Sequence, residues 1–165
     1  MVKDQRINKS IGISTHQSIN CPLTHAFSYR DVECVYKWCV DNKIVNNPKD
    51  ELVLYGQSIG SGPTCYIASQ PAKYPIAGIV LHSPLMSGTR VLTPSRILFL
   101  CDIFPNIDRI NKVRCPVFII HGVEDNEVHF FHGEKLFFKV PNEYKSDPWY
   151  SLTHSLTFSL THLLT

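Results

Sequence analysis

One short segment constrains the fold of this chain more than any other. Glu51-Leu-Val-Leu-Tyr55 is an apolar run of the length expected for a buried parallel strand. Gly56-Gln-Ser-Ile-Gly60 follows it directly, and a helix is expected over residues 59–69. A serine between two glycines, after a strand and before a helix, is typical of a sharp turn that exposes the hydroxyl at the carboxyl edge of a sheet. The segment therefore predicts a strand, a tight turn at Ser58 and a helix.

The remainder of the chain predicts further strands and helices in alternation. Apolar residues recur at helical spacing from Tyr29, and this helix is expected to end near Asn42. Short apolar runs predict strands at 76–81 and 116–120, and a last helix is expected at 130–139. Strands that alternate with helices favour an α/β fold with a parallel, doubly wound sheet.

Three regions of the chain differ in composition. Residues 1–27 are polar and lack periodicity, so they are expected to be poorly defined. Residues 28–150 are expected to form one domain, which agrees with the length of 165 residues. Residues 151–165 repeat Ser-Leu-Thr three times and are interpreted as a low-complexity tail.

The overall composition argues against several classes of function. The net charge is +2 and no continuous basic run occurs, so no nucleic-acid partner is expected. The six cysteines form no Cys-x-x-Cys pair and show no zinc spacing, so they are interpreted as reduced core residues, with no metal and no cofactor. No signal peptide opens the chain and no apolar run is long enough to span a bilayer, which predicts a cytoplasmic protein.

Two residues at the predicted sheet edge are candidates for catalytic chemistry. Ser58 is the candidate nucleophile, and the backbone N–H of Ile59, at the start of the helix, is expected to be an oxyanion donor. Asp125 follows the 116–120 strand directly, and in enzymes with this serine motif the acid comes after the nucleophile in chain order. A carboxylate there would orient an imidazole and stabilise its cation. Glu124 is the competing carboxylate.

The candidate for the general base is less well defined. His154 and His162 are the only histidines after the predicted 130–139 helix, and both lie in the repeat without flanking glycines. Of the two, His154 is the candidate base. Arg90 and Arg96 are expected on a solvated loop, with contact to an anionic or polar substrate as the alternative. The other histidines are expected to satisfy local hydrogen bonds: His16, His25, His82, His121, His129 and His132.

Longer segments resemble a known family. They are Asp31-Val-Glu-Cys-Val-Tyr-Lys-Trp38, Leu54-Tyr-Gly-Gln-Ser-Ile-Gly-Ser-Gly-Pro-Thr64, Val80-Leu-His-Ser-Pro-Leu-Met-Ser-Gly-Thr-Arg-Val91, Asp102-Ile-Phe-Pro-Asn-Ile-Asp108 and Val117-Phe-Ile-Ile-His-Gly-Val-Glu-Asp125. Together they resemble the α/β-hydrolase domain-containing protein 17 family over roughly residues 28–150. The His-Ser-Pro-Leu-Met-Ser-Gly segment is much more specific than the serine motif alone.

The resemblance implies a serine hydrolase that needs no cofactor and removes S-acyl groups, typically palmitoyl, from membrane-associated proteins. It implies that Ser58 is the nucleophile and Asp125 the acid. An S-acylated protein or another acyl ester would then be the substrate, which would bring the enzyme to the periphery of membranes.

The resemblance also implies a truncated α/β-hydrolase fold. The cysteine-rich anchoring segment of the family, its early strands and its His-Gly oxyanion loop have no counterpart in this chain. After Tyr150 the Ser-Leu-Thr repeat stands where a Gly-x-Gly-His loop is expected. The sheet is therefore expected to lack its early strands and its last strand.

Two alternative functions remain open at this point. One is a catalytically inactive fragment or pseudo-enzyme that only binds partners, because no well-placed base follows Asp125. The other is a general carboxylesterase or peptidase with the same nucleophile. Loss of one triad member can cost about four to six orders of magnitude in rate, so we expect weak reaction of Ser58 with a fluorophosphonate probe.

Overall fold

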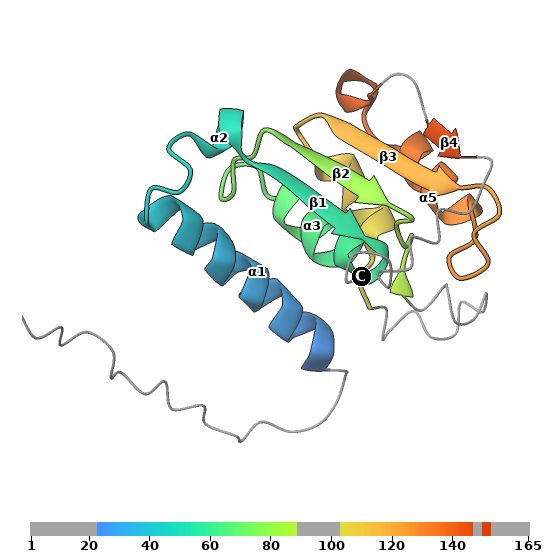
Figure 1. Ribbon diagram of the computed structural model, residues 1–165, viewed down its shortest axis with the longest axis horizontal. Coiled ribbons are helices and arrows are strands. Elements are labelled where there is room, and N and C mark those ends of the chain that lie inside the picture. Colours follow the sequence, from blue (N-terminus) through green and yellow to red (C-terminus); the bar gives the residue numbers. More distant parts are fainter. Residues whose placement is uncertain (1–22, 89–102, 147–149, 153–165) are drawn as a thin grey trace, which may run out of the picture.

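The computed structural model describes residues 23–88, 103–146 and 150–152 (Figure 1). The elements follow one another in this order: α1 (Leu23–Asp41), α2 (Pro48–Glu51), β1 (Val53–Gln57), η1 (Ser58–Gly60), α3 (Ser61–Ala68), β2 (Gly78–His82), η3 (Asn106–Asp108), η4 (Ile110–Lys112), β3 (Val117–Gly122), α5 (Phe131–Lys139), η5 (Asn142–Tyr144) and β4 (Tyr150–Leu152). Elements marked η are single turns of 3₁₀ helix. No helix in these described ranges is both long and apolar enough to cross a bilayer.

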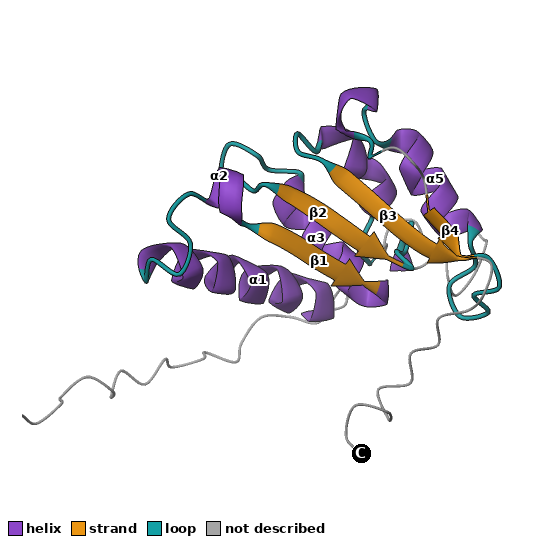
Figure 2. Ribbon diagram, turned by 45° about the horizontal axis from the view of Figure 1, so that its top comes forward, coloured by secondary structure: helices purple, strands orange, loops and turns teal. Residues whose placement is uncertain are grey.

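The four strands form one parallel sheet in the order β1-β2-β3-β4, which confirms the predicted α/β fold class. Consecutive strands are neighbours, so every connection advances in the same direction across the sheet. Because crossovers between parallel strands are right-handed, connections that all advance one way place their helices on the same face. Figure 2 shows α3 and α5 against one face of the sheet, with α1 beside α3. The described residues thus form one half of the doubly wound arrangement that the sequence predicts.

The burial of alternate strand residues follows from this one-sided arrangement. Ile79, Leu81 and Ile119 point to the helices and are at most 1% exposed. Val53 and Tyr55 of β1 point to the other face and are 56% and 58% exposed. Successive strand side chains alternate between faces, so only one side of β1 is buried among the described residues.

A buried cluster joins the helical layer to the sheet. Its members come from α1, α3, α5, β2, β3 and the segments that connect them, and the partly buried Leu54 of β1 packs against it. Its members are Tyr36, Cys65, Ile67, Ala68, Tyr74, Ile76, Ile79, Leu81, Met86, Ile107, Ile110, Val113, Cys115, Val117, Ile119, Leu136 and Val140. Hydrophobic burial of this kind is the main favourable term in folding.

Polar and aromatic contacts hold α1 against α3. The ring of Tyr29 stacks on the ring of Tyr66, with 4.2 Å between the centroids. The hydroxyl of Tyr66 donates to Glu33 at 2.7 Å, and the Nζ of Lys73 lies 3.3 Å from the same carboxylate. Arg109 donates to the Tyr29 hydroxyl, with its guanidinium carbon 4.7 Å from the Tyr29 ring centroid. These contacts hold α1 beside α3 in the helical layer.

The structure differs from the sequence prediction at both ends of the domain. Helix α1 begins at Leu23, six residues before the predicted start at Tyr29 and inside the segment expected to be poorly defined. Pro22 precedes Leu23, and proline is well tolerated at the start of a helix. At the other end β4 pairs with β3 through Ile120–Gly122, where the last strand was expected to be missing. Pairing needs only backbone groups, so the Ser-Leu sequence at the start of the repeat does not prevent it.

The difference between buried and exposed positions predicts the effects of matched isoleucine truncations, one in β3 and one in the turn after α1. Ile119→Ala removes a side chain that is 1% exposed and should lower the free energy of unfolding by about 2–5 kcal/mol. Ile44→Ala removes a side chain that is 61% exposed and should change it by less than about 0.5 kcal/mol. Urea denaturation followed by circular dichroism measures both values. Equal effects of the two substitutions would contradict this account of the core.

Candidate functional site

Ser58 lies on a strained turn between a strand and a helix. It directly follows β1, begins η1 and has φ 48°, which is the left-handed region of backbone conformation. Non-glycine residues rarely adopt this region and do so at a cost of about 1–3 kcal/mol. The strand, the sharp turn and the helix that the sequence predicts are therefore all present at this serine.

A buried hydrogen-bond network holds the backbone of this turn. The Ser61 hydroxyl donates to the carbonyl oxygen of Ser58 at 2.6 Å. The same hydroxyl oxygen accepts from the Leu85 amide and from Nδ2 of Asn106, both at 3.1 Å. Asn106 also donates to the Leu85 carbonyl at 2.9 Å, and both Ser61 and Asn106 are fully buried. A hydroxyl has one donor and two acceptor positions, so all three of Ser61 are used.

The sequence interpretation missed Ser61 and Asn106 as site residues. Neither residue type in isolation indicates such a role, because serine and asparagine are common in turns. A signal was nevertheless present, since both residues lie in segments quoted above for the family resemblance. The roles follow only from the folded structure, which brings together two residues that are 45 positions apart in sequence.

The two glycines of the serine motif have different roles. A Cβ on Gly56 would lie 2.5 Å from Oγ1 of Thr64 and 2.7 Å from the backbone oxygen of Gly60. Gly56 is therefore required for the close approach of β1 to α3. A Cβ on Gly60 would have no atom within 4 Å, so the close approach of strand and helix does not require the second glycine.

Asp125 lies on the loop that directly follows β3, and its carboxylate is held by three donors. Oδ1 accepts from the amides of Glu127 at 3.0 Å and Val128 at 2.9 Å. Oδ2 accepts from the Ser83 hydroxyl at 2.7 Å and lies 3.8 Å from Nε2 of His121. The side chain is 18% exposed. Its place at the carboxyl end of β3, two strands away from Ser58, is the one that the sequence predicts.

These partners change the acidity of Asp125. Burial raises the pKa of this carboxyl, but the Val128 amide, the Ser83 hydroxyl, the Glu127 amide and the nearby His121 together hold the pKa below its usual value. The ionised form therefore stabilises the folded protein above about pH 4, the pKa of an unfolded aspartate. That contribution is lost as the pH falls through the lower pKa of the folded state.

The surroundings of Asp125 differ from those of the competing carboxylate, Glu124, and of the nearby histidine, His121. Glu124 is exposed, whereas Asp125 is held by the donors described above. His121 is fully buried, and its Nε2 donates to the Val128 carbonyl at 2.7 Å. Burial lowers the pKa of His121, and the Val128 carbonyl and Asp125 offset part of this effect. The neutral imidazole of His121 packs against Gly133 and donates to a loop carbonyl. His121 therefore has a structural role.

His82, His129 and His132 make hydrogen bonds, but only the bond of His129 is local in sequence, as the prediction had it for all three. Nδ1 of His82 lies 2.7 Å from the Tyr55 hydroxyl. His129 accepts from the Phe131 amide, and His132 accepts from the Met86 amide.

Several predicted site residues lie outside the described ranges. These are the candidate base His154, the second histidine His162, and Arg90 and Arg96. Ile59 is described and is the second residue of η1. The first N–H groups of a helix have no acceptor within it, which suits its predicted role as an oxyanion donor.

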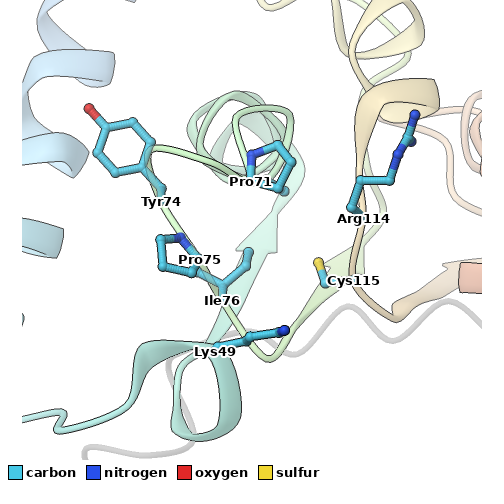
Figure 3. Close-up of a pocket in the computed structure, with 8 residues that line it drawn as sticks. Lys49, Pro71, Tyr74, Pro75, Ile76, Arg114 and Cys115 are labelled. Atoms are coloured by element: carbon cyan, nitrogen blue, oxygen red, sulfur yellow. The ribbon is translucent and has the colours of Figure 1, made fainter.

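A small cavity lies at the opposite end of the sheet. Its volume is about 270 Å³, and its walls include Tyr74, Ile76, Arg114 and Cys115, which precede β2 and β3 (Figure 3). Burial raises the pKa of the Cys115 thiol to about 11, so it is protonated at neutral pH. Because its lining residues precede β2 and β3, the cavity is separate from the carboxyl ends of the strands. In the part of the chain that the structure covers, no group of three His, Cys, Asp or Glu side chains is placed to hold a metal ion.

The two motif glycines give a matched test of the turn. Gly56→Ala should lower the free energy of unfolding by about 1–3 kcal/mol, because the added methyl meets backbone that cannot move away. Gly60→Ala has open space and a helical φ of −63°, so stability should stay unchanged or rise by up to about 1 kcal/mol. Thermal and urea unfolding of the two variants measure these changes. A larger loss at Gly60 than at Gly56 would contradict the turn geometry.

Comparison with known proteins supports the resemblance seen in the sequence. The chain matches no family model. It is 47% identical over 93 residues to human α/β-hydrolase domain-containing protein 17C, which covers 56% of this chain and 27% of that protein. Human protein 17B is 43% identical over 110 residues, or 66% of this chain and 36% of that protein. The α/β-hydrolase domain-containing protein aho-3 of Caenorhabditis elegans is 43% identical over 95 residues, or 57% and 28%.

Solved structures give the same fold at lower sequence identity. An esterase domain from Rhodothermus marinus has a TM-score of 0.56 and 14% identity, and covers 74% of this chain and 56% of that one. A sugar hydrolase from Lactococcus lactis has a TM-score of 0.59 and 14% identity, and covers 81% and 54%. The chain spans 27–36% of the length of the curated relatives reported above. The described residues thus form part of an α/β-hydrolase fold, and the resemblance of the chain to the α/β-hydrolase domain-containing protein 17 family is confirmed.

Proposed function

We propose that this chain carries the nucleophile and the acid of a serine hydrolase that cleaves thioesters on S-acylated proteins. The observation that carries the proposal is the strained φ of 48° at Ser58, on a turn where an α/β-hydrolase fold holds its nucleophile. The ordered carboxylate of Asp125, at the same edge of the sheet, supports it. The names of the relatives and the esterase and hydrolase titles of the structures support hydrolysis as the reaction class.

The chemistry would proceed through an acyl-enzyme. Oγ of Ser58 attacks the acyl carbonyl carbon while an imidazole base takes the hydroxyl proton. The backbone N–H of Ile59 donates to the oxyanion that forms. As the carbon–sulfur bond breaks, the imidazolium returns the proton to the leaving thiolate. Water, deprotonated by the same base, then hydrolyses the ester on Ser58, and Asp125 stabilises the imidazolium in both halves.

The identity of the base is part of the proposal. His154 is the candidate in chain order, since it follows Asp125 as the histidine of such a triad does. His121 does not suit this role, because it is fully buried and its Nε2 donates to a backbone carbonyl.

An apolar groove between α5, η3 and the loop after β2 supports a substrate with an acyl chain. The groove has a volume of about 470 Å³ and is lined by Met86, Ile107, Phe131, Phe138 and the side chains of Lys135 and Lys139. Met86 follows Leu85, whose amide is bound to the Ser61 hydroxyl under the nucleophile turn. Concave, mostly apolar surfaces are typical of sites that bind hydrophobic ligands. The S-acyl group is chosen over other esters because of the similarity to proteins 17B and 17C.

The test is Ser58-dependent reaction with a fluorophosphonate probe. We expect weak labelling of the chain as printed and stronger labelling when free imidazole is added, because imidazole supplies the proton acceptor that a serine hydroxyl needs. Ser58→Ala should abolish labelling under both conditions. Ser69→Ala, at the other end of the same helix, is the matched control and should leave labelling unchanged. In-gel fluorescence and mass spectrometry of the labelled peptide measure the outcome.

The possible results separate the parts of the proposal. Strong labelling without imidazole that is lost in His154→Ala would assign the base to His154. Absence of Ser58-dependent labelling with and without imidazole would contradict a serine hydrolase. Where labelling occurs, turnover of a palmitoyl thioester in preference to the oxygen ester and the amide supports the thioesterase. The opposite preference would favour an esterase or peptidase.

A further inference from the structure

Ser83 lies between the two strands that lead to the candidate catalytic residues. It directly follows β2, which pairs with β1 on one side and with β3 on the other. Its amide donates to the Ile120 carbonyl of β3 at 2.9 Å, and its hydroxyl donates to Oδ2 of Asp125 at 2.7 Å. One residue thus anchors the end of β2 to β3 through its backbone and to the loop after β3 through its side chain.

The backbone of Ser83 is strained. Its φ is 43°, in the same left-handed region as Ser58 at the end of the neighbouring strand. Ser83 also precedes Pro84, and a proline ring pushes the preceding residue toward extended conformations. Such strain persists when surrounding structure enforces it, and it concentrates at functional sites. Glycine would adopt this φ without cost, yet the chain has a serine whose hydroxyl is in use.

The two oxygens of the Asp125 carboxylate have different partners. Oδ1 accepts from two amides of its own loop, those of Glu127 and Val128. Among the described residues Ser83 is the one hydrogen-bond donor to Oδ2, and His121 lies 3.8 Å from that oxygen. A carboxylate oxygen can accept a second hydrogen bond, so Oδ2 keeps capacity for an imidazole N–H.

We propose that Ser83 is a positioning residue for the catalytic acid. Its hydroxyl holds Oδ2 of Asp125 at the end of β2, next to β1, the strand that Ser58 follows. The role rests on the proposed function, because it supposes that Asp125 is the acid of a triad. Without the Ser83 hydroxyl, Asp125 keeps its two loop amides but loses its link to the adjacent strand. The carboxylate is then less stabilised as an anion and less restrained in direction.

Two substitutions separate positioning from support of the fold. Ser83→Ala removes the hydroxyl and keeps the strained φ, so it should also lower stability. Ser83→Gly removes the hydroxyl and relieves the strain, so stability should stay level or rise. Both variants should raise the pKa of Asp125. Ser69→Ala is the control and should leave it unchanged.

The first readout is the ¹³C carboxyl resonance of Asp125 during a pH titration, assigned with Asp125→Asn. The range runs from pH 7 down to the pH at which circular dichroism shows unfolding of each variant. The neighbouring titratable groups are His121 of β3, Glu124 and Glu127 of the same loop, and His82 and His129, which act on His121. Their resonances are followed in parallel so that a shift at Asp125 is not assigned to a change in their charge. We expect protonation of Asp125 to begin at higher pH in Ser83→Gly than in the parent.

The second readout is Ser58 labelling with imidazole present. We expect the labelling rate of Ser58 to fall by up to about tenfold in Ser83→Gly, since a hydrogen bond to a charged group is lost. The stability of this variant should be equal to that of the parent or higher. An unchanged Asp125 titration in Ser83→Gly would overturn the proposal, and so would a shifted titration with unchanged labelling. If the parent itself shows no Ser58-dependent labelling, the proposed function fails, while the titration still reports separately on the Ser83–Asp125 contact.

Discussion

The hydroxyl of Ser61 joins three parts of the chain that are far apart in sequence. It receives hydrogen bonds from the loop after β2 and from η3, and gives one to the carbonyl of Ser58. Because the hydroxyl is fully buried, no water can replace a partner that is lost, and an unpaired buried group costs about 1–3 kcal/mol. The strained backbone of the turn at Ser58 depends on these hydrogen bonds. The loop after β2, which contains Ser83 and Met86, depends on them too. Oδ1 of Asn106 has no partner among the described residues, which indicates that asparagine is held there for its donor.

The elements that sequence predicted well are those with a strong local pattern. The apolar runs before Ser58 and Asp125 became β1 and β3, and the glycine after the first run marked a turn that does require it. Helix α5 agrees with the predicted range to within one residue. These features depend on periodicity and on turn chemistry within about ten residues, which a single sequence displays.

The features that sequence did not predict depend on distant contacts. The pairing of β4 with β3 is determined by backbone hydrogen bonds, to which residue type contributes little. The roles of Ser61, Asn106 and Ser83 depend on contacts between residues that are 24 to 45 positions apart in sequence. The sequence already favoured Asp125 over Glu124, but it did not show the hydrogen-bond donors of Asp125, which are two amides of its own loop and the hydroxyl of Ser83 after β2. A motif identifies the residue at the centre of a turn, but it does not identify the residues that hold that turn in place.

The open space around Gly60 affects how such turns are recognised in other proteins. A search pattern that demands glycine on both sides of the serine treats the two positions as equal, although only the first is crowded. Natural sequences with alanine or serine at the second position would be passed over by that pattern while forming the same turn. The hydroxyl of Ser61, three positions after Ser58, instead binds the Ser58 carbonyl directly. A search pattern built on Gly56, Ser58 and Ser61 would therefore rest on the three positions that have a defined role in this turn.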